Sequence, residues 1–144
     1  MEKLPFDRVR WPLVALLASA GMLAAAYGIF ETLLHLRYPD RDLTVRNLCF
    51  PGDTPGYRPR AGRDSQWAFP GAEKFRPEFK RHRGDGIEPA PDDWLKLCKA
   101  DVVLGIFGYN ESFDGPAGVE KFSAELEAWI THTRSMKYNG KSAP

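Results

Sequence analysis

The stretch Asp101–Gly108, with the sequence DVVLGIFG, decides the fold prediction for this chain. Its large side chains from Val102 to Phe107 are all apolar, and they form a near-continuous run instead of alternating with polar residues. A run of this kind is typical of a strand that is buried on both faces, as strands are in a parallel sheet. A short helix is expected just before it, at Asp93–Lys99, with Asp92 as its N-cap.

A long helix is expected after this strand, at about residues 116–138. Pro116 suits its first turn, Asp114 is its expected cap and Asn139-Gly140 ends it. Its apolar residues recur at spacings of three and four, so they form one stripe on the helix: Val119, Phe122, Leu126, Trp129 and Ile130.

The earlier part of the chain predicts a second strand and a long connection. Leu43–Leu48 (LTVRNL) is β-branched and partly alternating, which favours a strand, and it leads into a turn at Cys49–Thr54. Residues 51–91 then contain seven prolines and six glycines in 41 residues. Such a density cannot sustain a regular helix or strand, so this segment is expected to be a long surface excursion with at most short turns of helix.

The alternation of helices and strands predicts an open, largely parallel α/β sheet with crossover helices. Ligands of such sheets bind beyond the carboxyl ends of the strands, which here are Cys49–Thr54 and Gly108–Ser112. These two loops are therefore the expected location of any chemistry. The same arrangement places Cys49 and Cys98 at opposite ends of the sheet, about 20 Å apart, which argues against a disulfide between them.

The N-terminal region predicts insertion into a membrane. Trp11–Phe30 contains no charged residue, and as a helix it would be about 30 Å long, which matches the hydrocarbon core of a bilayer. The preceding residues are mildly basic, so the N-terminus is expected in the cytoplasm and the rest of the chain outside it. The segment is either an uncleaved signal anchor or a secretory signal cleaved near Ala24–Ala26. A buried helix and a misassigned start are the remaining alternatives. The helix is expected to continue through Glu31–Tyr38.

Charge and composition argue against several classes of function. The net charge is +1 and the pI is about 7.8, so no global electrostatic attraction to nucleic acid is expected. The one basic run, Lys74–Arg83, is interpreted as a solvated loop. Cys49 and Cys98 have no metal-ligand spacing, and His35 has no second ligand at helical spacing. We therefore expect no metal and no cofactor.

Two short motifs resemble conserved blocks of the SGNH/GDSL hydrolases. Asn47–Thr54 (NLCFPGDT) is similar to the second block, a strand that ends in a Gly-Asp-Thr turn. Gly108–Glu111 (GYNE) is similar to the third block, Gly-x-Asn-Asp, with Glu as the final acid. The surrounding sequence is also similar to planctomycete-type SGNH-like domains, in the segments LRYPDRDLTVRNL, FGYNESFDGPAG and KYNGKSAP. The resemblance covers about residues 31–144.

The resemblance implies an ester hydrolase with an oxyanion hole. Ester hydrolysis passes through a tetrahedral intermediate whose negative oxygen needs fixed donors. By resemblance, the backbone N–H of Gly52 and the side-chain amide of Asn110 are these donors. The alternative interpretation makes Gly52 a simple turn glycine and Asn110 a loop cap.

The chain departs from the family pattern at the nucleophile and the base. The family's Gly-Asp-Ser serine is absent, because the apolar stretch occupies its position, and no Asp-x-x-His block is present. Ser112 has no nucleophilic role in the family, and Asp92 and His132 are not expected to substitute for the base. Residues 1–30 are therefore interpreted as a membrane anchor or signal, and residues 31–144 as a partial SGNH-like domain that is truncated at both ends.

The expected fold is a partial flavodoxin-like α/β sheet behind one hydrophobic helix, and the expected function is an ester-hydrolase fragment that is inactive by itself. The alternative is a non-catalytic, membrane-anchored binding module. The main domain is expected outside the cytoplasm, anchored or secreted, with an ester as the substrate of any active form. In a flavodoxin-like order, the absent first strand would lie between Leu43–Leu48 and Val102–Phe107. Their unpaired edges would leave residues 31–144 marginally stable without a partner chain.

Overall fold

The computed structural model describes residues 28–59, 65–79 and 90–144. The chain divides into two compact units, with the boundary between Asn47 and Leu48, and each unit is described by itself.

The first unit contains helix α2 (Ile29–Arg37). Gly28 begins it in the left-handed conformation, with φ of 71°, and its carbonyl accepts both the backbone N–H and the hydroxyl of Thr32, each at 2.9 Å. A helix is thus present over most of residues 31–38, but it begins at Ile29 and does not continue an earlier helix through Gly28, as was expected. None of its side chains is buried, and its apolar residues Ile29, Leu33 and Leu36 are more than half exposed.

The predicted membrane segment, residues 11–30, lies outside the described residues except for its last three. Among the residues that the structure does describe, none of the helices has both the length and the apolar character needed to cross a bilayer.

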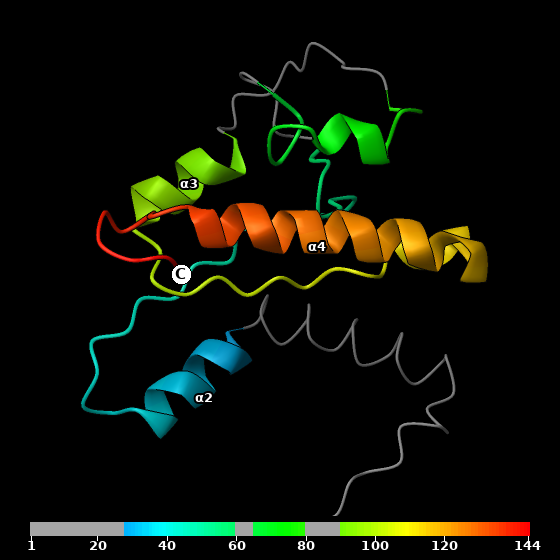
Figure 1. The fold of residues 1–144 in the computed structure, drawn as a ribbon. Coiled ribbons are helices and arrows are strands. Elements are labelled where there is room, and N and C mark those ends of the chain that lie inside the picture. Colours follow the sequence, from blue (N-terminus) through cyan, green and yellow to red (C-terminus); the bar gives the residue numbers. More distant parts are fainter. Residues whose placement is uncertain (1–27, 60–64, 80–89) are drawn as a thin grey trace, which may run out of the picture. The chain divides into compact units, whose positions relative to one another are not determined.

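Helix α4 (Val119–Ser135) is the longest helix of the second unit (Figure 1). Around it are helix α3 (Pro91–Cys98) and the short 3₁₀ helices η2 (Ala72–Phe75), η3 (Glu111–Asp114) and η4 (Pro116–Gly118). The two helices predicted around the apolar run are therefore present. Neither predicted cap is correct, because Ala90 precedes α3 and Gly118 precedes α4, and both helices lack a side-chain cap.

The predicted α/β fold is wrong. The described residues are helical or irregular and form no sheet, and the pairing found among them is an isolated antiparallel bridge between Tyr57 and Trp67. Neither Leu43–Leu48 nor Asp101–Gly108 has a strand partner there. The physical reason is that an apolar sequence favours an extended backbone, whereas a strand of a sheet also requires a neighbour that supplies hydrogen bonds.

The segment Val102–Phe107 runs as an extended chain along α4 (Figure 1). Its covered side packs on Trp129: the ring of Phe107 meets the indole edge-on with centroids 5.0 Å apart, and Gly105 lies directly against it. On the other side, Val102, Leu104 and Ile106 are 74%, 60% and 43% exposed. The expectation of burial on both faces is therefore wrong, because only one face is covered.

The buried apolar residues lie largely within the Pro- and Gly-rich segment. Ala68, Phe69 and Ala72 form the core cluster, and Trp67, Phe75, Ala128 and Trp129 pack against it. The prediction of a surface excursion is thus wrong for residues 54–57 and for the buried residues of 66–76, although η2 is the short turn of helix that it allowed. Prolines and glycines exclude regular elements without preventing an irregular chain from packing on a helix.

Gly105 is expected to be required for the packing of the extended segment on α4. A Cβ at this position would lie 2.8 Å from two ring atoms of Trp129. We predict that Gly105→Ala lowers the free energy of unfolding by about 1–3 kcal/mol, as overpacking does. Leu97→Ala, at a side chain that is 70% exposed on α3, is the control and is expected to change it by less than about 0.5 kcal/mol. Equal effects of both changes in urea unfolding would contradict the packing.

Candidate functional site

The two loops that carry the sequence motifs lie next to each other in the second unit. The side-chain amide of Asn110 donates a hydrogen bond of 2.7 Å to the backbone carbonyl of Asp53. Asn110 stands at the N-cap position of η3, but its side chain makes no capping bond there. Its side chain therefore connects the loops at Cys49–Thr54 and Gly108–Ser112 instead of capping η3.

The first loop turns at Gly52. This residue has φ of 92°, in the left-handed region that residues other than glycine rarely adopt. Asp53 follows, with its N–H bonded to the carbonyl of Phe50 at 3.3 Å and its carboxylate paired with Arg58. The N–H of Gly52 makes no hydrogen bond within the described part of the chain. It is thus a donor on an exposed turn.

The second loop is closed by its own side chains. Gly108 has φ of 114°, and its N–H donates to Oε2 of Glu111 at 2.8 Å. Its carbonyl accepts the N–H of Ser112 at 3.0 Å, and the hydroxyl of Ser112 donates to the carbonyl of Tyr109 at 2.6 Å. These bonds hold the backbone on both sides of Asn110, which orients its side chain towards Asp53.

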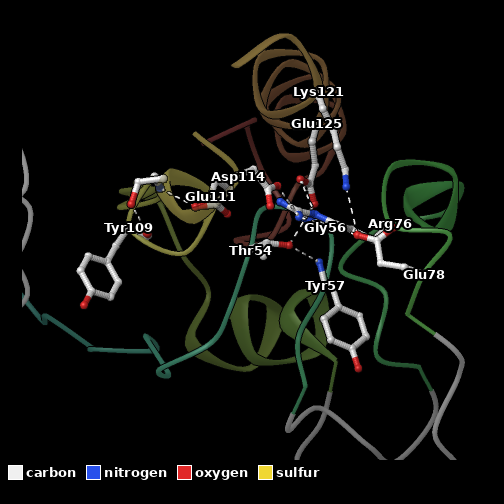
Figure 2. Close-up of polar contacts among 12 residues, drawn as sticks. Thr54, Gly56, Tyr57, Arg76, Glu78, Tyr109, Glu111, Asp114, Lys121 and Glu125 are labelled. Atoms are coloured by element: carbon white, nitrogen blue, oxygen red, sulfur yellow. Dashed lines mark hydrogen bonds and ion pairs between the residues drawn. The ribbon is translucent and has the colours of Figure 1, made fainter. Parts of the chain in front are cut away.

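A buried carboxylate bonds the residues at the end of the first loop (Figure 2). Glu125, on α4, is completely buried, and its Oε1 accepts the hydroxyl of Thr54 and the N–H of Gly56, each at 2.9 Å. The hydroxyl of Thr54 in turn accepts the N–H of Tyr57 at 3.0 Å. The turn at residues 54–57 is therefore fixed to α4 by one side chain. Gly56 is needed for this approach, because a Cβ there would lie 2.8 Å from Oε1.

Arg76 supplies the opposite charge. Its guanidinium is 6% exposed, and Nε donates to Oε2 of Glu125 at 3.2 Å, while a second nitrogen contacts Asp114 at 3.3 Å (Figure 2). Glu78 lies 3.9 Å from the same nitrogen and is paired with Lys121 of α4. An isolated buried charge is costly, so Glu125 and Arg76 each offset the cost of burying the other.

Glu111 is a second buried carboxylate in this region. It is 4% exposed, and its Oε1 has no hydrogen-bond partner within the described residues. Burial raises the pKa of Glu111 above its ordinary value, and the charge of Glu125 adds to that shift, whereas the N–H groups of Glu111 and Gly108 and the charge of Arg76 oppose it. The carboxyl group thus favours the protonated form more than a carboxyl group in water does.

The predicted site residues differ in their surroundings. Gly52 is exposed and Asn110 is half-buried, and the Asn110 amide uses one of its two N–H groups for Asp53. The arrangement can therefore offer two neutral donors at adjacent loops. Among the residues described, no group of three His, Cys, Asp or Glu side chains is placed to hold a metal ion.

Two side chains near the motifs, Ser112 and Cys49, could act as nucleophiles. Ser112 uses its hydroxyl to bond the carbonyl of Tyr109, and none of its described contacts is a base. Partial burial of the thiol raises the pKa of Cys49, an effect that the charge of Arg58 opposes and that of Asp53 supports. A raised pKa keeps the thiol protonated and therefore weakly nucleophilic.

His132 has a partner that sequence reasoning missed. Its Nε2 lies 2.8 Å from Oδ2 of Asp92, and the hydroxyl of Tyr138 donates to the other oxygen of that carboxylate at 2.7 Å. Burial and the bond to Asp92 raise the pKa of Tyr138 far above its ordinary value. Asp92 thus connects α3 to α4 and to the segment after it, instead of capping α3. His132 also stacks on Phe69, with centroids 5.7 Å apart, so the structure gives this pair a packing role.

Glu125 and Arg76 were also missed, although one signal pointed to Glu125. It lies three residues after Phe122 and four before Trp129, so it falls within the apolar stripe of the helix. An acidic residue at such a position is either buried with a partner or exposed at the edge of the stripe. The sequence offered no indication that the partner would be Arg76, which is 49 residues away.

Comparisons of the sequence with protein-family models, of the chain with curated proteins, and of the fold with solved structures give no match.

The raised pKa of Glu111 predicts a specific dependence of stability on pH. An unfolded chain releases this proton near the ordinary value of 4.5, whereas the folded protein releases it at a higher pH. Between these values the folded state holds more protons, so its stability falls as the pH rises through the window. We predict that Glu111→Gln, which cannot ionise, removes this contribution. The stability of the unaltered chain relative to the variant should therefore decrease as the pH rises above 4.5.

Urea unfolding of the unaltered chain and of Glu111→Gln, at a series of pH values from 4.5 upwards, measures the difference between their free energies of unfolding. Carbon-13 NMR titration of the Glu111 carboxyl group gives its pKa directly. A relative stability that increases with pH, or a pKa below 4.5, would contradict the account of this residue.

Proposed function

We propose that residues 31–144 carry the oxyanion-binding part of an SGNH/GDSL-type ester-hydrolase site, in a chain that does not hydrolyse esters by itself. The observation that carries the proposal is the 2.7 Å bond from the Asn110 amide to the carbonyl of Asp53. This bond brings the GYNE motif beside the GDT turn, although the two motifs are more than fifty residues apart in the sequence.

The chemistry of the proposal rests on two donors. The N–H of Gly52 and the second N–H of the Asn110 amide are available to a developing negative oxygen. Fixed donors of this kind stabilise a tetrahedral intermediate because they are oriented before the charge develops. Loss of one such donor in a working enzyme costs about 100- to 1,000-fold in rate. The bonds of Asp53 and Glu111 fix the two loops, so neither donor depends on a mobile side chain.

Among the residues that the structure describes, no activated nucleophile is found for the attack itself. Acyl transfer requires a nucleophile in contact with a base. The Ser112 hydroxyl bonds the carbonyl of Tyr109 and His132 bonds Asp92, so these two side chains do not form such a pair. We therefore expect an ester carbonyl to bind without turnover. A complete reaction would need a nucleophile and a base from elsewhere, as the absence of the family's serine and Asp-x-x-His motifs also implies.

A non-catalytic binding module, held at a membrane with the second unit outside the cytoplasm, is the second candidate. It is favoured by the exposed apolar residues of α2, Ile29, Leu33 and Leu36, which lie at the end of the uncharged run Trp11–Phe30 or just after it. In this case the fold would recognise a carbohydrate or a protein, and the Asn110 amide would have no special part in recognition.

Binding of a tetrahedral anion tests the first proposal. We predict that the ethyl methylphosphonate anion, a mimic of the tetrahedral intermediate, saturably shifts the NMR signals of the Gly52 N–H and the Asn110 side-chain amide. Asn110→Ala should abolish this binding because it removes one of the two donors. Asn139→Ala is the matched control, since that amide bonds Asp101 and Ser142 instead. The signal of the Gly56 N–H, bonded to Glu125, reports whether each variant keeps its fold.

Two results would contradict the proposal: binding that persists in Asn110→Ala, or shifts that map away from both loops. Saturable binding of an acetylated oligosaccharide that is unaffected by Asn110→Ala would support the binding module instead. Labelling of a serine by a fluorophosphonate probe would show that the chain has an active nucleophile, which the proposal excludes.

A further inference from the structure

The backbone of Val102–Phe107 is not paired. None of its N–H and C=O groups takes part in a hydrogen bond with any residue that the structure describes. The segment is extended, and such a row of unpaired groups is a template for another strand. Because these donors and acceptors follow the period of a strand, the ligand that fits them is an extended polypeptide.

The exposed side chains of the segment are of one kind. Val102, Leu104 and Ile106 lie on the side away from Trp129, and all three are exposed. No charged residue occurs between Asp101 and Glu111, so nothing within the segment opposes pairing with an apolar strand. The gatekeeping charges that protect most strand edges are therefore absent here.

We infer that this chain forms a two-fold dimer in which Val102–Phe107 pairs antiparallel with the same segment of a second copy. With the axis at Leu104, Leu104 faces its own counterpart, and Val102 faces Ile106. The exposed apolar side chains thus meet only each other, which is the self-complementarity that a two-fold interface requires. Val103 faces Gly105 on the side that packs on α4.

Charge determines the direction of pairing. In a parallel, in-register pair, the two copies of Asp101 would face each other directly, and like charges in that position are destabilising. In the antiparallel pair, Asp101 faces Phe107, and the two Asp101 carboxylates are about 20 Å apart at the rise of a β-strand. That separation exceeds the screening length of about 8 Å at physiological salt, so their repulsion is negligible. The dimer does not depend on the proposed ester chemistry.

The molar mass of the full chain in detergent micelles, corrected for the detergent by light scattering, tests the inference. We predict a dimer for the unaltered chain and a monomer for Leu104→Asp, because two carboxylates would then meet at the axis. Val119→Asp is the matched control: Val119 is 50% exposed and apolar, and an acidic residue suits the first turn of α4. This variant should remain a dimer.

Crosslinking tests the register. In a chain with Cys49→Ser and Cys98→Ser, we predict that Leu104→Cys forms a disulfide between copies on mild oxidation, since facing residues of paired strands lie close enough. Val119→Cys in the same background should not. A monomeric unaltered chain, a Leu104→Asp variant that remains dimeric, or equal crosslinking at both positions would overturn the inference. So would stable pairing of the segment with a strand of a different protein in place of the second copy.

Discussion

A single buried ion pair, between Glu125 and Arg76, is the interaction on which the second unit depends. Glu125 is fully buried, and its carboxylate is bonded by Arg76, by the hydroxyl of Thr54 and by the N–H of Gly56. Removing a charge from water is costly, and the cost is offset only when the partners are close and the remaining oxygen sites are satisfied. The partners of Glu125 come from segments distant from it in the sequence: Thr54 and Gly56 from one, and Arg76 from another. The ion pair therefore constrains how these two irregular segments pack on α4.

The position of the candidate site follows from this constraint. Thr54 ends the first loop, so a carboxylate that holds Thr54 and Gly56 also fixes where Gly52 and Asp53 lie. Asn110 then bonds the carbonyl of Asp53 and brings the second loop to the first. Among the described residues, the buried apolar cluster consists of Ala68, Phe69 and Ala72. The polar contacts of Glu125 and Asn110 therefore connect the segments that carry the candidate site. The two neutral donors of that site lie on a turn that a buried charge holds in place.

Helices could be predicted from the sequence, whereas strands could not. The helices near 31–38, 93–99 and 116–138 follow from local periodicity and helix-ending residues, and the structure contains all three. Val102–Phe107 has the composition of a buried strand, yet a sheet also needs a neighbour, and no neighbour lies in the described part of the chain. Asp92 and Asp114 were expected to cap helices. Instead, the carboxylate of Asp92 bonds His132 and Tyr138, and that of Asp114 bonds Arg76, all of them distant in the sequence. The motifs singled out Gly52 and Asn110, while their support by Glu125 depends on contacts that no local pattern encodes.

A double-mutant cycle between Arg76 and Glu125 tests this account most directly. The free energy of unfolding would be measured for the unaltered chain, for Arg76→Met, for Glu125→Gln and for the double variant. Each single change leaves a buried group without its partner, and we predict a loss of about 3–5 kcal/mol for each. The double variant should lose less than the sum, with a coupling free energy of about 1–3 kcal/mol, because both charges are then absent. Additive losses, with a coupling free energy near zero, would contradict the claim that this ion pair organises the unit.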